Sequence, residues 1–183
     1  MTFLDRLRRW IPKDTLPRRL WRRYKIWRYT SRLAGPKLVD AFARAYPGAY
    51  FIQVGSNDGE QLDPLRKAIL SRPWRGIMIE PVPYVFSRLQ QNYGHLQDRV
   101  RLENVAIAEH DGKQAFYHLA RVADYAAEGL PQWYDALGSF RKEVLLKHVN
   151  FIPDIEQRVI CSEVPSLSFA SLLARNHVEQ LDL

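Results

Sequence analysis

The sequence has a single cysteine, Cys161, among its 183 residues. One cysteine can form no internal disulfide bond and can supply no cysteine-rich zinc site. Cys161 lies in an apolar run that is typical of a strand, so we expect a buried packing residue rather than a reactive thiol. No cluster of metal-ligand residues stands out at a suitable spacing, and we therefore expect no metal site.

Long hydrophobic runs are also missing from the sequence. No stretch approaches the roughly 20 apolar residues that a membrane-spanning helix needs. The N-terminus, from Met1 to Arg6, lacks the unbroken apolar core of a secretion signal. We therefore expect a cytoplasmic protein.

Acidic residues are scarce near the N-terminus, because the first 47 residues carry 13 of the 27 Lys and Arg but only 3 of the 20 Asp and Glu. Apolar residues recur there at helical spacing among the basic ones, which predicts basic amphipathic helices. This basic leader (residues 1–47) has three open roles. The first role is packing on the rest of the chain. The second is peripheral contact of residues 1–34 with an anionic membrane surface, and the third is binding of nucleic acid. Nucleic acid is the least favoured partner.

From residue 48 onward, segments with strand character alternate with segments of helical periodicity. We expect strands near 49–54, 75–81, 100–107, 114–119 and 158–164, and helices near 60–71, 83–93, 139–148 and 168–176. Asp111-Gly112 predicts a hairpin turn, while 121–137 is irregular. The alternation predicts an α/β domain over 48–183, with a mainly parallel, doubly wound sheet flanked by helices.

Two glycines, Gly55 and Gly59, follow the first expected strand, with Ser56, Asn57 and Asp58 between them. Glycines at such a turn let the backbone approach a ligand beyond the carboxyl ends of parallel strands. The spacing differs from the dinucleotide fingerprint, and the lysine of a phosphate-binding loop is absent. A purely structural turn remains the alternative at this point.

The second expected strand ends in an acidic residue, Glu80, which comes 21 residues after Gly59. A carboxylate at this place can accept hydrogen bonds from both hydroxyls of a ribose. Its alternative is a surface acid beside Pro81. The loop and the acid together favour a nucleoside ligand, whose base would then lie beside residues 104–106 at the end of the third strand.

The chain resembles the FkbM-type methyltransferases, which use S-adenosylmethionine on a Rossmann-like fold. The matching segments are 51–59 with Asp63-Pro64, 79–81, 103–107, 138–140, 147–148 and 164–167. The resemblance implies that the loop Gly55-Ser56-Asn57-Asp58-Gly59 holds the methionine part of the cofactor, and that Gln53 is also among the cofactor-binding residues. It also implies that Glu80 holds the ribose, that Pro81 belongs to the cofactor site, and that Asn104, Val105 and Ala106 flank the adenine.

The implied reaction is methylation of a hydroxyl oxygen on a sugar, a glycolipid or a similar small acceptor. Such a transfer needs a base. His110, His118, His148 and Asp111 are candidates, and His148 is favoured because it lies in a segment that resembles the family.

Members of the family continue past the equivalent of residues 181–183 with a further strand. We therefore expect this domain to be incomplete at its C-terminus. Two other functions stay open: a non-catalytic remnant of such an enzyme, and a membrane- or nucleic-acid-binding module that acts through the basic leader.

Overall fold

The computed structural model describes residues 35–183. The helices expected within residues 1–34, and the membrane and nucleic-acid contacts proposed for them, fall outside the described residues. The chain divides into two compact units, Met1–Arg44 and Ala45–Leu183. Helix α3 spans Gly35–Ala45, and its last residue is the first of the second unit. None of the described helices is long and apolar enough to cross a membrane.

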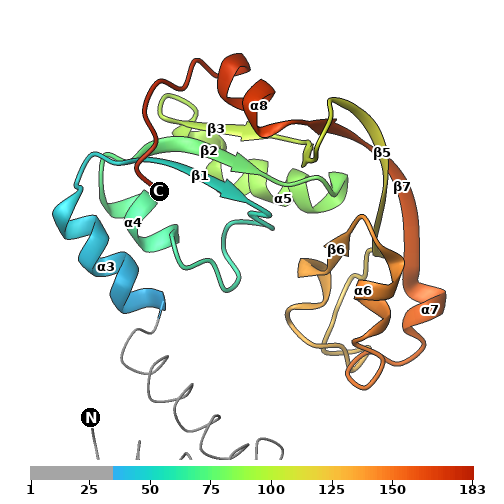
Figure 1. The fold of residues 1–183 in the computed structure, drawn as a ribbon. Coiled ribbons are helices and arrows are strands. Elements are labelled where there is room, and N and C mark those ends of the chain that lie inside the picture. The colour runs from blue at the N-terminus through green and yellow to red at the C-terminus, as the bar shows by residue number, and fades with distance from the viewer. Residues whose placement is uncertain (1–34) are drawn as a thin grey trace, which may run out of the picture. The chain divides into compact units, whose positions relative to one another are not determined.

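Three parallel strands form the sheet that follows (Figure 1). They are β1 (Tyr50–Val54), β2 (Arg75–Ile79) and β3 (Val100–Glu103), in the order β1-β2-β3. β2 is the central strand, and its residues from Gly76 to Ile79 are all buried. A near-continuous apolar run is what a strand covered on both faces requires. The α/β class and the parallel pairing expected from the sequence are confirmed for these strands.

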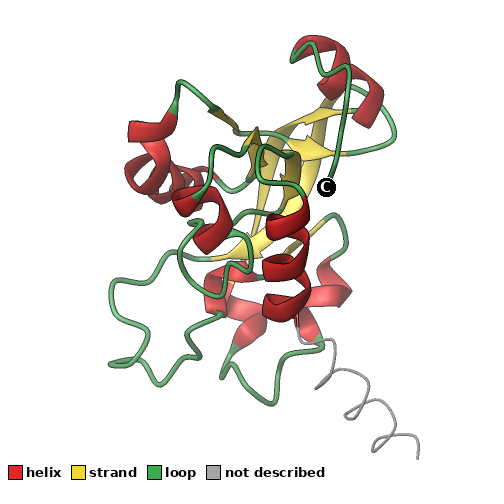
Figure 2. Ribbon diagram, turned by 90° about the vertical axis from the view of Figure 1, so that its left-hand side faces the viewer, coloured by secondary structure: helices red, strands yellow, loops and turns green. Residues whose placement is uncertain are grey.

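Helices cover both faces of this sheet (Figures 1 and 2). Helix α5 (Pro83–Tyr93) lies on one face and buries Val85, Leu89 and Tyr93. Helix α8 (Phe169–Arg175) lies on the other, where Leu172 packs with Ile77 and Ile79 of β2. Both helices have the expected bounds to within a residue or two. Pro83 starts α5 because its fixed φ and missing N–H suit the first helical turn.

The remaining strands form a second sheet in the order β4-β7-β5-β6. They are β4 (Ala106–Ile107), β5 (Gly112–Leu119), β6 (Gly138–Ser139) and β7 (Val159–Leu167). β7 pairs in parallel with β4 and antiparallel with β5, so the sheet is mixed. The expected hairpin between the strand near 100–107 and β5 is wrong, because β7 lies between β4 and β5.

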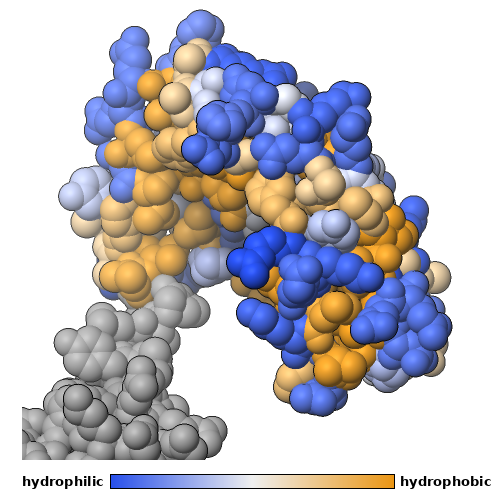
Figure 3. All heavy atoms as spheres, turned by 45° about the vertical axis from the view of Figure 1, so that its right-hand side comes forward, coloured by the Kyte–Doolittle hydropathy of each residue, from blue (hydrophilic) through white to orange (hydrophobic). Residues whose placement is uncertain are grey.

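A small lobe, residues 120–158, connects β5 to β7. It contains a 3₁₀ turn, η3 (Tyr134–Ala136), and two short helices, α6 (Lys142–Leu146) and α7 (Ile155–Arg158). Its core consists of five buried residues of the lobe together with Leu119, the last residue of β5; the five are Leu130, Tyr134, Leu145, Ile152 and Ile155. Figure 3 shows hydrophobic patches among hydrophilic residues on this lobe, and a hollow in the surface beside it.

Three sequence expectations differ from the structure in detail. The helix expected at 60–71 is α4 (Arg66–Ser71), because Asp58 and Asp63 accept the N–H groups of Glu60, Gln61 and Leu65 and so hold turns in place of a first helical turn. The strand expected at 100–107 splits into β3 and β4. Cys161 is exposed rather than buried, because side chains along β7 alternate between the two faces of the sheet and Cys161 is on the outward face.

The last residues of the chain run beside β1. The Asp182 and Leu183 N–H groups both donate to the carbonyl oxygen of Tyr50, at 3.0 and 3.3 Å, and the Ile52 N–H donates to the Leu183 carbonyl oxygen at 2.9 Å. Leu183 thus forms hydrogen bonds with both neighbours of Phe51, which is the pattern of a parallel strand pair. The segment expected to approach another strand therefore lies along the edge of β1 opposite to β2.

Candidate functional site

The ends of β1 and β2 are joined by the first residues of the glycine loop. The N–H groups of Gly55 and Ser56 both donate to the carbonyl oxygen of Ile79, each at 2.9 Å. The Ser56 hydroxyl donates to the Gln53 carbonyl oxygen at 3.0 Å and accepts the Ile79 N–H at 3.1 Å. Ser56 is buried. Its side chain therefore fixes the loop to the carboxyl ends of both strands, where ligands of parallel sheets bind.

Glu80 holds the next part of the loop. One carboxylate oxygen, Oε2, accepts the Asn57 N–H at 3.0 Å, and Oε1 accepts the Val82 N–H at 2.9 Å. Glu80 is buried, with 7% of its surface exposed. It thus also shapes the loop and starts α5, a role that the sequence did not suggest. Each carboxylate oxygen has a second lone pair, so a diol can still donate to both.

Burial raises the pKa of the Glu80 carboxyl to about 7, because the charged form loses hydration. The N–H groups of Val82 and Asn57 and the charge of Arg88 lower this pKa, and the charge of Asp58 raises it. Near neutral pH the group therefore titrates, unlike an ordinary surface glutamate.

The pH dependence of stability should reveal this shift. The folded-state pKa of Glu80 lies above its ordinary value of 4.5, so unfolding releases a proton between about pH 4.5 and 7. Stability associated with Glu80 is full below pH 4.5 and falls by about 3 kcal/mol as pH rises to 8. Urea unfolding of wild type and Glu80→Gln from pH 5 to 8 measures it. A wild-type curve parallel to that of Glu80→Gln would contradict the assignment.

The two glycines of the loop have different reasons to be glycine. Both take a positive φ, +72° at Gly55 and +69° at Gly59, which favours glycine. A Cβ at Gly59 would lie 2.4 Å from Cε2 of Tyr93, whereas a Cβ at Gly55 would have no atom within 4 Å. Gly59 is thus needed for packing on α5, and Gly55 leaves open space at the strand ends.

The end of the third strand is tied to the same place. The Asn104 side-chain amide donates to the carbonyl oxygens of Glu80 and Pro81, at 2.7 and 3.1 Å. These bonds turn the chain between β3 and β4. Val105 and Ala106 are buried, so their side chains belong to the core and only their backbone is placed to face a ligand.

Two buried carbonyl oxygens at this site have no hydrogen-bond partner within the described part of the chain. They are Oε1 of Gln53 and Oδ1 of Asn57. The Gln53 amide nitrogen donates to Oδ1 of Asp63 at 2.9 Å, which fixes the amide with its oxygen free. Unpaired buried acceptors are rare in proteins, because each loses its hydration without compensation. These two atoms fit a ligand that brings N–H or O–H donors, such as an ammonium group.

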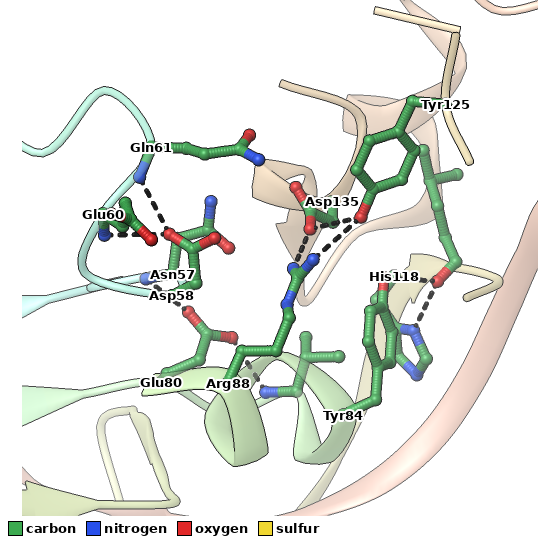
Figure 4. A network of polar contacts seen from close by, with 12 residues as sticks. Asn57, Asp58, Glu60, Gln61, Glu80, Tyr84, Arg88, His118, Tyr125 and Asp135 are labelled. Carbon is green, nitrogen blue, oxygen red and sulfur yellow. Dashed lines mark hydrogen bonds and ion pairs between the residues drawn. The ribbon is translucent and has the colours of Figure 1, made fainter. Parts of the chain in front are cut away.

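A second group of polar side chains lies beside the loop (Figure 4). Arg88 extends from α5 to Asp135 of the lobe and forms an ion pair with its Oδ2. Tyr125, also of the lobe, donates to the same oxygen at 2.7 Å and accepts from Nη1 of Arg88 at 3.0 Å. No local pattern in the sequence indicates this triad, because Arg88 lies on α5 while Tyr125 and Asp135 lie in the irregular 121–137 segment.

His118 and Tyr84 border the triad (Figure 4). Nδ1 of His118 lies 3.0 Å from the carbonyl oxygen of Leu119, and Nε2 lies 2.9 Å from the hydroxyl oxygen of Ser162. A carbonyl only accepts, so in the neutral ring Nδ1 carries the hydrogen and Nε2 accepts from Ser162. The guanidinium of Arg88 stands 5.8 Å from the ring centre of Tyr84.

His148, the favoured base, lies in the lobe just after α6. Its ring centre is 5.4 Å from that of Trp133. His110 and Asp111 are exposed at the turn before β5, where Asp111 accepts the Ser168 N–H at 2.7 Å. The structure thus brings Ser56, Asn57, Glu80 and Asn104 together, and His118 rather than His148 borders the polar triad. Residues 35–183 hold no cluster of side chains suited to a metal ion.

Comparisons with known proteins add no assignment: no family model matches the chain, and neither the curated proteins nor the solved structures contain a significant match.

Proposed function

We propose that this chain is an S-adenosylmethionine-dependent methyltransferase that acts on a hydroxyl oxygen of a sugar, a glycolipid or a similar small acceptor. One observation carries the proposal: a glycine loop after β1 is hydrogen-bonded to a buried carboxylate at the end of the neighbouring parallel strand, β2. A backbone loop and an acid in this relation suit a nucleoside with an attached polar chain. The resemblance of the sequence motifs to those of FkbM-type methyltransferases favours S-adenosylmethionine as this nucleoside.

The residues present fit this cofactor. Glu80 would accept from the two ribose hydroxyls with its remaining lone pairs. The free carbonyl oxygens of Gln53 and Asn57 would accept from the ammonium of the methionine part, whose chain would lie over Gly55. Asn104, with the backbone of 105–106, would flank the adenine. Bound S-adenosylmethionine supplies an electrophilic methyl group; the protein supplies position and a proton acceptor.

We extend the proposal to the finer fold, a Rossmann-like sheet. Two features support it: the parallel order β1-β2-β3, and the parallel contact of residues 182–183 with the other edge of β1. Such an arrangement places β1 inside the sheet, so that its glycine loop opens at a central point of the ligand-binding edge. The base stays a prediction at His148.

Calorimetric titration of the full chain with S-adenosylmethionine, and separately with S-adenosylhomocysteine, tests the proposal. We expect both to bind with a Kd in the micromolar range, since they share the nucleoside and the amino-acid end. Adenosine, which lacks the amino-acid end, should bind more weakly because it leaves Gln53 and Asn57 unpaired. A folded chain that binds none of the three would overturn the proposal and favour the non-catalytic remnant.

A further inference from the structure

We propose that Arg88 and Asp135 form a recognition site for a hydroxyl group of a neutral polyol, such as a sugar. The site lies outside the residues assigned to the cofactor. It rests on the proposed function only in that this polyol would be the methyl acceptor. The proposal depends on two buried polar atoms that have no partner and on the charge balance of the pair that carries them.

The two unpartnered atoms are Nε of Arg88 and Oδ1 of Asp135. The Asp135 side chain is 0% exposed, and that of Arg88 is 31% exposed. Leaving either atom unpaired is unfavourable, because the atom has given up its hydrogen bond to water without gaining another. The other polar atoms of the pair have partners. Oδ2 of Asp135 accepts from Nη2 of Arg88 and from the Tyr125 hydroxyl, and Nη1 of Arg88 donates to the Tyr125 hydroxyl oxygen.

One donor and one acceptor on adjacent side chains match the chemistry of a hydroxyl, which donates one hydrogen bond and accepts others. A hydroxyl can donate to Oδ1 of Asp135 and accept from Nε of Arg88. The ion pair has no net charge, so it does not attract an anionic ligand. The carboxylate of such a ligand would also face the negative charge of Asp135. A neutral polyol is therefore the ligand class that suits the pair.

The position of the pair fits an acceptor beside a cofactor. Arg88 lies on α5, and Glu80 lies at the end of β2 just before this helix. The charge of Arg88 lowers the pKa of the Glu80 carboxyl. Figure 4 shows Arg88 extending between the Asn57–Gln61 loop and the lobe segment with Tyr125 and Asp135. Both free atoms are screened from solvent, so entry of a ligand requires the irregular 121–137 segment to shift.

The test is a two-dimensional ¹H–¹⁵N spectrum of the full chain that resolves the Arg88 Nε–H signal, assigned by its loss in Arg88→Lys. The probes are methyl glucoside, methyl galactoside, methyl mannoside and inositol, with glucuronate as the anionic comparison. We expect a saturable shift of this signal with at least one neutral probe and a weaker response to glucuronate. Saturation transfer from protein to probe protons gives a second readout that does not need Arg88.

Asp135→Asn should weaken the binding of the neutral probe at least tenfold, since a hydrogen bond to a charged acceptor is lost. Lys113→Gln, in an exposed ion pair with Glu163, is the matched control and should leave binding unchanged. If Asp135→Asn does not fold, Arg88→Lys measured by saturation transfer replaces it. The proposal is overturned by no response to any neutral probe up to about 100 mM, by undiminished binding in the variant, or by stronger binding of glucuronate.

These outcomes are independent of the cofactor test. A chain that binds S-adenosylmethionine but no polyol keeps the proposed function and loses this site. A chain that binds the polyol at Arg88 but no S-adenosylmethionine loses the proposed function and keeps a polyol site. Asp135→Asn should still bind S-adenosylmethionine as the wild type does, because none of the atoms assigned to the cofactor belongs to Asp135.

Discussion

Gly59→Ala is expected to lower the free energy of unfolding by about 4 kcal/mol. The new methyl group would lie 2.4 Å from Cε2 of Tyr93 and 2.8 Å from Cδ1 of Leu89. Both neighbours are fully buried, so neither can move aside without disturbing the core. The positive φ adds strain for any residue with a Cβ. Urea unfolding monitored by circular dichroism measures the change.

Gly55→Ala is the matched control, because it has the same sign of φ and no atom within 4 Å of the added Cβ. We expect a loss of only about 1 kcal/mol in unfolding free energy, from backbone strain alone. In this variant the free energy of S-adenosylmethionine binding should fall by more than the free energy of unfolding, since the added methyl group enters the space above the loop. Equal losses of stability in the two variants would show that Gly59 does not pack as described.

Glu80→Gln is expected to weaken S-adenosylmethionine binding roughly 100-fold at pH 8, where Glu80 is ionised. The substitution keeps the shape of the side chain but removes the negative charge that would accept from both ribose hydroxyls. Its amide NH₂ also meets a backbone N–H that Glu80 now binds, from either Asn57 or Val82. Calorimetric titration of the two proteins measures the difference.

The control for this variant is Glu60→Gln, which removes the same charge from the residue that follows the glycine loop. Glu60 is exposed and pairs with Arg66 at 3.0 Å, so its loss should change the affinity by less than about twofold. Thermal unfolding of both variants at pH 8 separates a loss of binding from a loss of folding. Equal affinity in wild type and folded Glu80→Gln would remove Glu80 from the cofactor site.

Much of the fold could be predicted from local patterns. β1, β2, α5 and α8 appear within a few residues of where the apolar spacing places them, and the structure shows Pro83 in the first turn of α5 and Ser168 as the cap of α8. The elements that differ depend on distant contacts. Asn104 ends β3 because its amide reaches the carbonyl oxygens after β2, and no feature of 100–107 announces this.

The candidate site divides in the same way. Ser56, Asn57 and Glu80 could be placed together from the sequence, because a loop and an acid that follow adjacent parallel strands must meet at one edge of the sheet. The second role of Glu80, which shapes the loop through the Asn57 N–H, could not be predicted, because it depends on a hydrogen bond between residues 23 positions apart. The triad of Arg88, Tyr125 and Asp135 could not be predicted, since two of its members lie in an irregular segment without periodicity.

The most direct test of the central claim, a nucleoside site at the glycine loop, is a ¹H–¹⁵N spectrum of the full chain titrated with S-adenosylhomocysteine. We predict saturable shifts of the backbone amides of Gly55, Ser56, Asn57 and Gly59, together with that of Asn104. Amides of the lobe near His148 should move little. Unchanged signals from the loop in a folded protein, or shifts confined to residues 138–158, would contradict the claim.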